Sequence, residues 1–117
     1  MYLCLMYSRE LVKGTLQTVI LRLLRESGRM YGYEMTQHVR ELSQGKYQLT
    51  EGSLYPTLHK MEKEGLLGTE REQVGGRVRK YYRLTEKGRA AAGSRIEEFR
   101  DFMQTMQRIL DLKPEVK

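Results

Sequence analysis

The sequence of 117 residues has no tryptophan, one cysteine and two prolines, and it has no long apolar run. The single cysteine, Cys4, excludes an intrachain disulfide and is consistent with a reducing compartment. No apolar stretch approaches the ~20 residues that cross a bilayer, and the apolar residues 1–7 lack the basic region that begins a signal peptide. These absences predict a soluble, cytoplasmic protein without a membrane segment.

Signatures of catalysis and metal binding are also missing. His38, His59 and Cys4 fall on separate predicted elements, at spacings that metal sites do not use. The pair Gly75-Gly76 is not followed by Lys-Ser or Lys-Thr, as a phosphate-binding glycine loop would be. We therefore expect no enzymatic activity, no bound metal and no cofactor.

What the sequence does have is positive charge. Lysine and arginine number 21 against 15 aspartates and glutamates, which gives a formal net charge of +6. The excess is concentrated between residues 77 and 87. This segment has five basic residues, Arg77, Arg79, Lys80, Arg83 and Lys87, and one acidic residue, Glu86. A cationic segment of this density favours a polyanionic partner such as nucleic acid.

Apolar residues that recur every three or four positions predict four helices, and two strand-like segments precede the last of them. The predicted elements are helices over 8–27, 31–42 and 51–64, strands over 67–73 and 78–84, and a helix over 86–112. Gly75-Gly76 can adopt the positive φ angles of a tight hairpin turn. Thr50 and Thr85 are suited to cap the third and fourth helices.

This order of elements predicts a mainly α fold with a small two-stranded β-hairpin. It corresponds to a winged helix-turn-helix DNA-binding domain over 8–84, followed by a long C-terminal dimerisation helix over 85–112. Residues 1–7 and 113–117 are expected to be terminal extensions. The helical spacing assigns Leu11, His38 and Leu42, among others, to inward positions.

The last predicted helix carries an apolar seam with heptad spacing. Its members are Ala92, Ile96, Phe99, Met103, Met106 and Leu110. A small core of three helices cannot cover so long a stripe. The seam therefore predicts a homodimer formed through its last five members. Packing of the helix on its own domain is the competing interpretation.

The same helix also offers a candidate ligand pocket. Phe99, Phe102 and Met103, with Met106 and the N-terminal residues Leu5, Met6 and Tyr7, could line an apolar cavity between subunits. Such a cavity would suit a small apolar effector. Ordinary core packing of these side chains is the alternative interpretation.

Three motifs resemble the PadR family of bacterial transcriptional regulators. They are YGYE (31–34), EGSLYPTLHKMEKEGLL (51–67) and RKYYRLTEKG (79–88), and KGTL (13–16) is similar to the opening helix of the family. One departure is Tyr31, where many relatives have histidine. The resemblance implies a dimeric winged-helix repressor of the compact subgroup with one C-terminal helix, often relieved by phenolic or drug-like ligands. It also implies a DNA contact for Tyr33, whose alternative is a half-buried ring.

In a helix-turn-helix, the N-terminal part of the recognition helix enters the major groove. The side chains expected there belong to Ser53, Tyr55, Thr57, His59 and Lys60. Tyr55 could instead be a core aromatic residue, and Ser53 and Thr57 could lie on a solvated face of the helix.

At the hairpin, Arg77, Arg79 and Lys80 are expected to contact the DNA backbone. The competing interpretation is a solvated edge strand, whose cations discourage pairing with other strands. Tyr81, Tyr82 and Leu84 are expected to pack the hairpin onto the helical body.

The function predicted from these features is sequence-specific binding to a double-stranded DNA operator by a homodimeric repressor. Two alternatives stay open: a winged-helix protein-interaction module, and a nucleic-acid-binding protein without sequence specificity. The cationic hairpin argues against the first alternative, because an interaction module does not need it.

Overall fold

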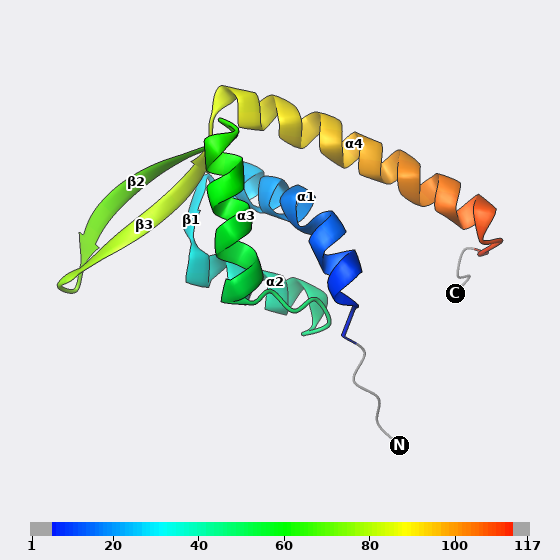
Figure 1. The fold of residues 1–117 in the computed structure, drawn as a ribbon, viewed down its shortest axis with the longest axis horizontal. Helices are drawn as coiled ribbons and strands as arrows, with labels where there is room; N and C mark the ends of the chain where they lie inside the picture. Colours follow the sequence, from blue (N-terminus) through cyan, green and yellow to red (C-terminus); the bar gives the residue numbers. More distant parts are fainter. Residues whose placement is uncertain (1–5, 114–117) are drawn as a thin grey trace, which may run out of the picture.

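The computed structural model of the protein describes residues 6–113. These residues form α1 (Arg9–Ser27), β1 (Arg29–Tyr31), α2 (Gly32–Ser43), α3 (Glu51–Lys63), β2 (Leu67–Val74), β3 (Arg77–Leu84) and α4 (Glu86–Ile109) (Figure 1). The predicted helices and both hairpin strands are therefore present. Cys4 and Leu5 lie outside the described residues.

The prediction of a two-stranded hairpin was wrong, because the sheet has three strands in the order β1-β3-β2. The short strand β1 pairs antiparallel with β3, and Met30 lies opposite Tyr82. Three residues are too few to show the alternation that identifies a strand. The backbone of Arg29–Tyr31 takes this form because β3, about fifty residues later in the chain, supplies its partners.

The core lies between the three N-terminal helices and the inner face of the sheet. It is built from Leu16, Ile20, Leu21, Leu23 and Leu24 of α1, Met35 and Val39 of α2, Leu54, Leu58 and Met61 of α3, and Met30, Leu66, Leu67, Tyr82, Leu84 and Ala92. Three predicted inward positions are wrong for this chain: His38 is exposed, Leu11 is 61% exposed and Leu42 is 71% exposed. Leu11 and Leu42 border grooves that no other described segment fills.

The helices begin where side-chain oxygens accept hydrogen bonds from the first turn. Ser8 Oγ accepts from the backbone N–H of Leu11, at 3.3 Å. Thr50 Oγ1 accepts from the N–H of Ser53, at 3.2 Å, and Thr85 Oγ1 accepts from the N–H of Gly88, at 3.0 Å. The predicted caps Thr50 and Thr85 are confirmed, and both satisfy N–H groups that have no partner inside the helix.

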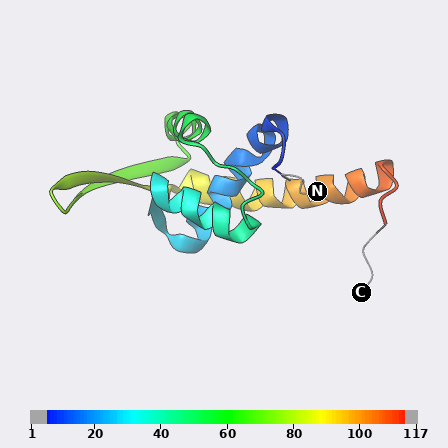
Figure 2. The ribbon, with the colours of Figure 1, turned by 90° about the horizontal axis from the view of Figure 1, so that it is seen from below.

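The helix α4 begins against the body and then leaves it. Gly88 and Ala92 are its buried residues, whereas the side chains from 100 to 104 are exposed. Seen from below, the hairpin and the C-terminal half of α4 extend to opposite sides of the helical body (Figure 2). The helix ends at Ile109 and not at Leu112, because Asp111 has a left-handed φ of 56°.

Candidate nucleic-acid interface

The recognition helix α3 buries one face and leaves the opposite face to solvent. Leu54, Leu58 and Met61 are fully buried against α1 and the sheet. His59 and Lys60, two of the predicted DNA-contact residues, are exposed. The exposed face of α3 therefore offers an imidazole and an ammonium group, both of which can donate hydrogen bonds to bases or phosphates.

Two further predicted contact residues, Ser53 and Thr57, are half-buried and bonded within the helix. Ser53 Oγ donates to the carbonyl oxygen of Thr50, at 3.0 Å, and Thr57 Oγ1 donates to the carbonyl oxygen of Ser53, at 2.9 Å. Each hydroxyl has thus used its single donor, while its oxygen can still accept. In this conformation both side chains suit a donor on a base edge, such as the amino group of adenine or cytosine.

Tyr55 joins α3 to the start of α2. A Cβ atom added to Gly32 would overlap the Tyr55 hydroxyl and lie 2.7 Å from Cζ, so only glycine permits this approach. Burial raises the pKa of the Tyr55 phenol, and the nearby carboxylate of Glu51 adds to the shift. The hydroxyl therefore stays protonated near neutral pH. The ring, 36% exposed, is neither a full core residue nor a free surface side chain.

This contact brings two predicted residues into one region of the surface. Tyr33 follows Gly32 directly and is 62% exposed. Because the Tyr55 ring packs against Gly32, Tyr33 of α2 and the N-terminal half of α3 lie beside each other. Their arrangement matches that of the two helices of a helix-turn-helix.

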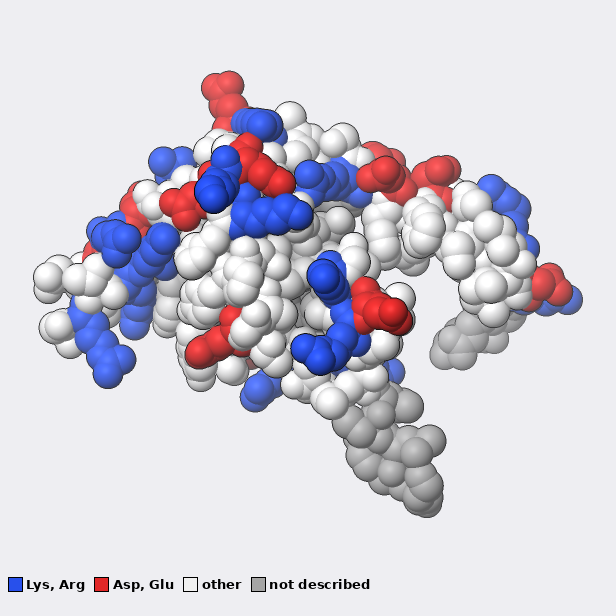
Figure 3. Space-filling model, in the orientation of Figure 1, with Lys and Arg blue, Asp and Glu red and all other residues white. Residues whose placement is uncertain are grey.

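The three predicted cations of the hairpin have different surroundings. Gly75 and Gly76 have φ angles of 56° and 79°, as the predicted tight turn requires, and Arg77 beside them is exposed. Arg79 is half-buried, with its guanidinium carbon 4.1 Å from the centre of the Tyr31 ring. Lys80 Nζ lies 3.6 Å from Glu62 of α3. Figure 3 shows basic side chains gathered at the end of the hairpin.

The aromatic residues of β3 divide between the two faces of the sheet. Tyr82 and Leu84 are buried against the helical body, as predicted. Tyr81 is also buried, but its ring packs edge-on against Tyr31 of β1, with the ring centres 5.4 Å apart. Packing of Tyr81 on the body was therefore a wrong prediction. The alternation of a strand sends neighbouring side chains to opposite faces.

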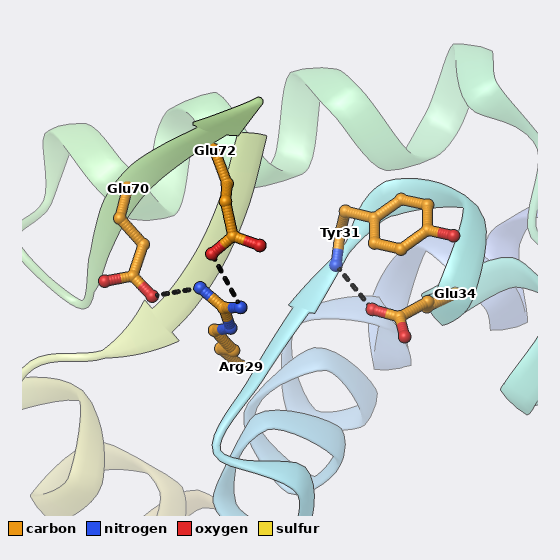
Figure 4. A network of polar contacts seen from close by, with 5 residues as sticks. All are labelled: Arg29, Tyr31, Glu34, Glu70 and Glu72. Atoms are coloured by element: carbon orange, nitrogen blue, oxygen red, sulfur yellow. Dashed lines mark hydrogen bonds and ion pairs between the residues drawn. The ribbon is translucent and has the colours of Figure 1, made fainter. Parts of the chain in front are cut away.

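Sequence reasoning missed a polar network on the outer face of the sheet. Arg29 of β1 bonds to Glu70 and Glu72 of β2, and Tyr31 donates its backbone N–H to Glu34 (Figure 4). Glu70 and Glu72 are two residues apart on a predicted strand and therefore share one face, which the sequence alone could have shown. Arg29 gave no such signal, because the strand that carries it was not predicted.

An open apolar groove of about 410 Å³ lies between α1, α2 and α4. Ile96 and Phe99 of the predicted dimer seam line it, together with Val19, Leu23 and Leu42. Of the other members of the seam, Ala92 is buried in the core of the single chain, whereas Met103, Met106 and Leu110 are half-buried or exposed. In the single chain, Phe102 and Met103 line separate grooves that share only Phe99, and the predicted ligand cavity between subunits stays a prediction.

Within residues 6–113, no three or more histidine, cysteine, aspartate or glutamate side chains are grouped so that they could hold a metal ion. Among the described helices, none combines the length and apolarity needed to cross a membrane.

The sequence matches a known family over most of its length. Residues 20–94 match the model of the transcriptional regulator PadR-like family. A transcriptional regulator of Mycobacterium tuberculosis is 48% identical over 62 residues, which are 53% of this chain and 55% of that protein. An uncharacterized protein of Lysinibacillus sphaericus is 32% identical over 92% of this chain and 94% of its own length.

Solved structures of regulators share the fold. A transcriptional regulator from Clostridium thermocellum superposes with a TM-score of 0.78 at 27% identity, over 87% of this chain and 96% of that chain. A PadR-family regulator from Eggerthella lenta gives a TM-score of 0.76 at 28% identity, over 89% of this chain and 88% of the other.

Proposed function

The chain belongs to the PadR-like family of transcriptional regulators, and from this premise we propose that it represses transcription by binding operator DNA as a homodimer. In this proposal residues 8–84 bind DNA and residues 85–112 join the two subunits. Five side chains of α3 contact base edges or phosphates in the major groove: Ser53, Tyr55, Thr57, His59 and Lys60. Tyr33 contacts the backbone beside them, and Arg77, Arg79 and Lys80 follow the backbone or minor groove.

The observation that carries the proposal is that exposed hydrogen-bond donors lie on α3, on the first turn of α2 and at the end of the hairpin. His59 and Lys60 project from α3, Tyr33 projects from the first turn of α2, and Arg77 projects from the end of the hairpin. Among the described residues, Arg77 has no ion-pair partner. Its charge is therefore available to a phosphate, and phosphate neutralisation supplies a large share of the affinity of DNA-binding proteins.

Dimerisation is supported by the apolar surface of α4. Phe102, Met103 and Leu110 are each about half-exposed in the single chain, and the groove beside Ile96 and Phe99 is open. A second copy of α4 laid along this surface would bury the seam and cover the groove from outside. The pairing would also place two recognition helices on one face of DNA, as a symmetric operator requires.

Relief of repression by a small apolar or phenolic ligand is a further part of the proposal. The groove lined by Phe99 is almost entirely apolar, and Thr15 and Tyr47 supply hydroxyls at one side. A ligand held there would shift α4 relative to α1. Such a shift changes the distance between the two recognition helices.

Removal of the wing cations tests the DNA-binding part of the proposal. We expect Arg77→Ala with Arg79→Ala to weaken binding to all duplex sequences and to lower the salt slope of log K by ~0.9 for each phosphate that the variant no longer neutralises. The measurement is fluorescence anisotropy with a labelled duplex over a series of salt concentrations. Arg25→Ala with Arg89→Ala removes the same charge from exposed helix positions and serves as control. Equal slopes for the two double variants would remove the wing from the interface.

A further inference from the structure

One arginine side chain joins all three strands of the sheet. Arg29 lies on β1, and its Nη1 atom donates to Glu70 Oε1 at 2.8 Å while Nη2 donates to Glu72 Oε2 at 3.0 Å. Both acceptors belong to β2, and β3 lies between β1 and β2. The guanidinium lies over the Tyr81 ring of β3, 3.9 Å from its centre.

A second stack runs in the opposite direction. Arg79 of β3 lies over the Tyr31 ring of β1, and the Tyr31 and Tyr81 rings meet edge to face. Each strand of the pair therefore sends an arginine onto a tyrosine of the other. Tyr31 is also the N-cap residue of α2, and its backbone N–H donates to Glu34 Oε1 at 3.1 Å. The hairpin is thus tied to the start of a helix that the proposed function brings to DNA.

The register explains why such a tie matters. The strand β1 pairs with Tyr81, Tyr82 and Arg83 of β3 and reaches no further toward the turn. From residue 71 to residue 80 the hairpin is therefore two-stranded, and an isolated two-stranded hairpin is only marginally stable in water. Glu72 lies opposite Arg79, beyond the last residue of β3 that β1 pairs with. The Arg29 side chain thus holds the hairpin past the end of its third strand.

We propose that Arg29 is a positioning residue for DNA binding, which holds the hairpin at a fixed angle to α2 and α3 without touching DNA itself. The proposal rests on the DNA-binding function proposed above. Two facing carboxylates outweigh the single charge of Arg29, so we do not assign its contribution to simple attraction of phosphate. The planar fork of an arginine suits this task, because it can bond two carboxylates while it stacks on a ring.

Arg29→Lys tests the proposal, because lysine keeps the charge but has neither the fork nor the flat face. The probe is a labelled 30-base-pair duplex of mixed sequence, titrated with the full chain over a series of salt concentrations. We expect binding about fivefold weaker than that of the wild type, with an unchanged salt slope. Amide hydrogen exchange in the free protein should become faster at residues 71–80 and stay unchanged in α1 and α3. Arg25→Lys makes the same exchange at an exposed helix position and should leave both measurements unchanged.

A second variant separates positioning from charge by the sign of its effect. Glu70→Gln with Glu72→Gln removes two negative charges from the hairpin, so attraction alone predicts tighter binding. Both ion pairs with Arg29 become weaker, uncharged hydrogen bonds, which predicts weaker binding and faster exchange at residues 71–80. Tighter binding by this variant, or wild-type affinity of Arg29→Lys, overturns the proposal. Failure of the wild-type chain itself to bind the duplex would instead contradict the proposed function, and the exchange rates would still report whether Arg29 orders the hairpin.

Discussion

Gly88→Ala is expected to lower the free energy of unfolding by about 3 kcal/mol. A Cβ atom at this position would overlap the carbonyl oxygen of Leu66 and lie 3.0 Å from its carbonyl carbon. Both are backbone atoms, and the same carbonyl accepts a hydrogen bond from the N–H of Thr85, at 3.1 Å. The segment therefore cannot yield locally. Relief of the overlap would require α4 to move away from the body.

The matched control for this prediction is Gly14→Ala. Gly14 lies inside α1, and a Cβ atom there would meet nothing within 4 Å. Alanine should therefore raise stability by up to about 1 kcal/mol, through the lower conformational entropy of the unfolded chain. Urea unfolding of both variants, at one protein concentration, measures the difference. Equal stability of Gly88→Ala and the wild type would contradict the close approach of α4 and Leu66.

Phe99→Glu is expected to convert the proposed dimer to a monomer and to weaken operator binding by about a hundredfold or more. Phe99 borders three neighbouring grooves along α4, so it lies at the centre of the surface that a second subunit would cover. A carboxylate there would be buried without a partner in the dimer. In a monomer it would stay in contact with water, so the fold of the single chain should survive.

Light scattering coupled to gel filtration measures the mass of this variant, and circular dichroism reports its helix content. Ala90→Glu introduces the same charge on an exposed side of α4, two residues from the buried Gly88, and should remain dimeric. A dimeric mass for Phe99→Glu would place the subunit contact elsewhere. A monomeric mass for the wild type would contradict dimerisation itself.

Local signals in the sequence predicted the helices, their caps and the turn. Thr50 and Thr85 have the side-chain oxygen that the first turn of a helix needs. Gly75-Gly76 supplies the two positive φ angles of the hairpin. These features depend on neighbouring residues alone, and the periodicity of α3 likewise identified Leu54, Leu58 and Met61 as its buried face.

Features that depend on distant residues were missed. The strand β1 exists because β3 pairs with it, and its three residues carry no alternation of their own. The position of Tyr81 over β1 and the reach of Arg29 to Glu72 both follow from that missing strand. Leu42 has the helical spacing of a core residue but borders an open groove, because spacing cannot tell whether the chain itself or another molecule covers a residue.

Selection of bound sequences from a random pool of duplex DNA tests the central claim most directly. The full chain is incubated with the pool at a stated salt concentration, and the bound fraction is amplified and sequenced. A symmetric dimer with two recognition helices predicts a palindrome whose half-sites are about one helical turn apart. Recovery of no common motif, with bound sequences as diverse as the pool, would contradict sequence-specific repression and would favour binding without specificity.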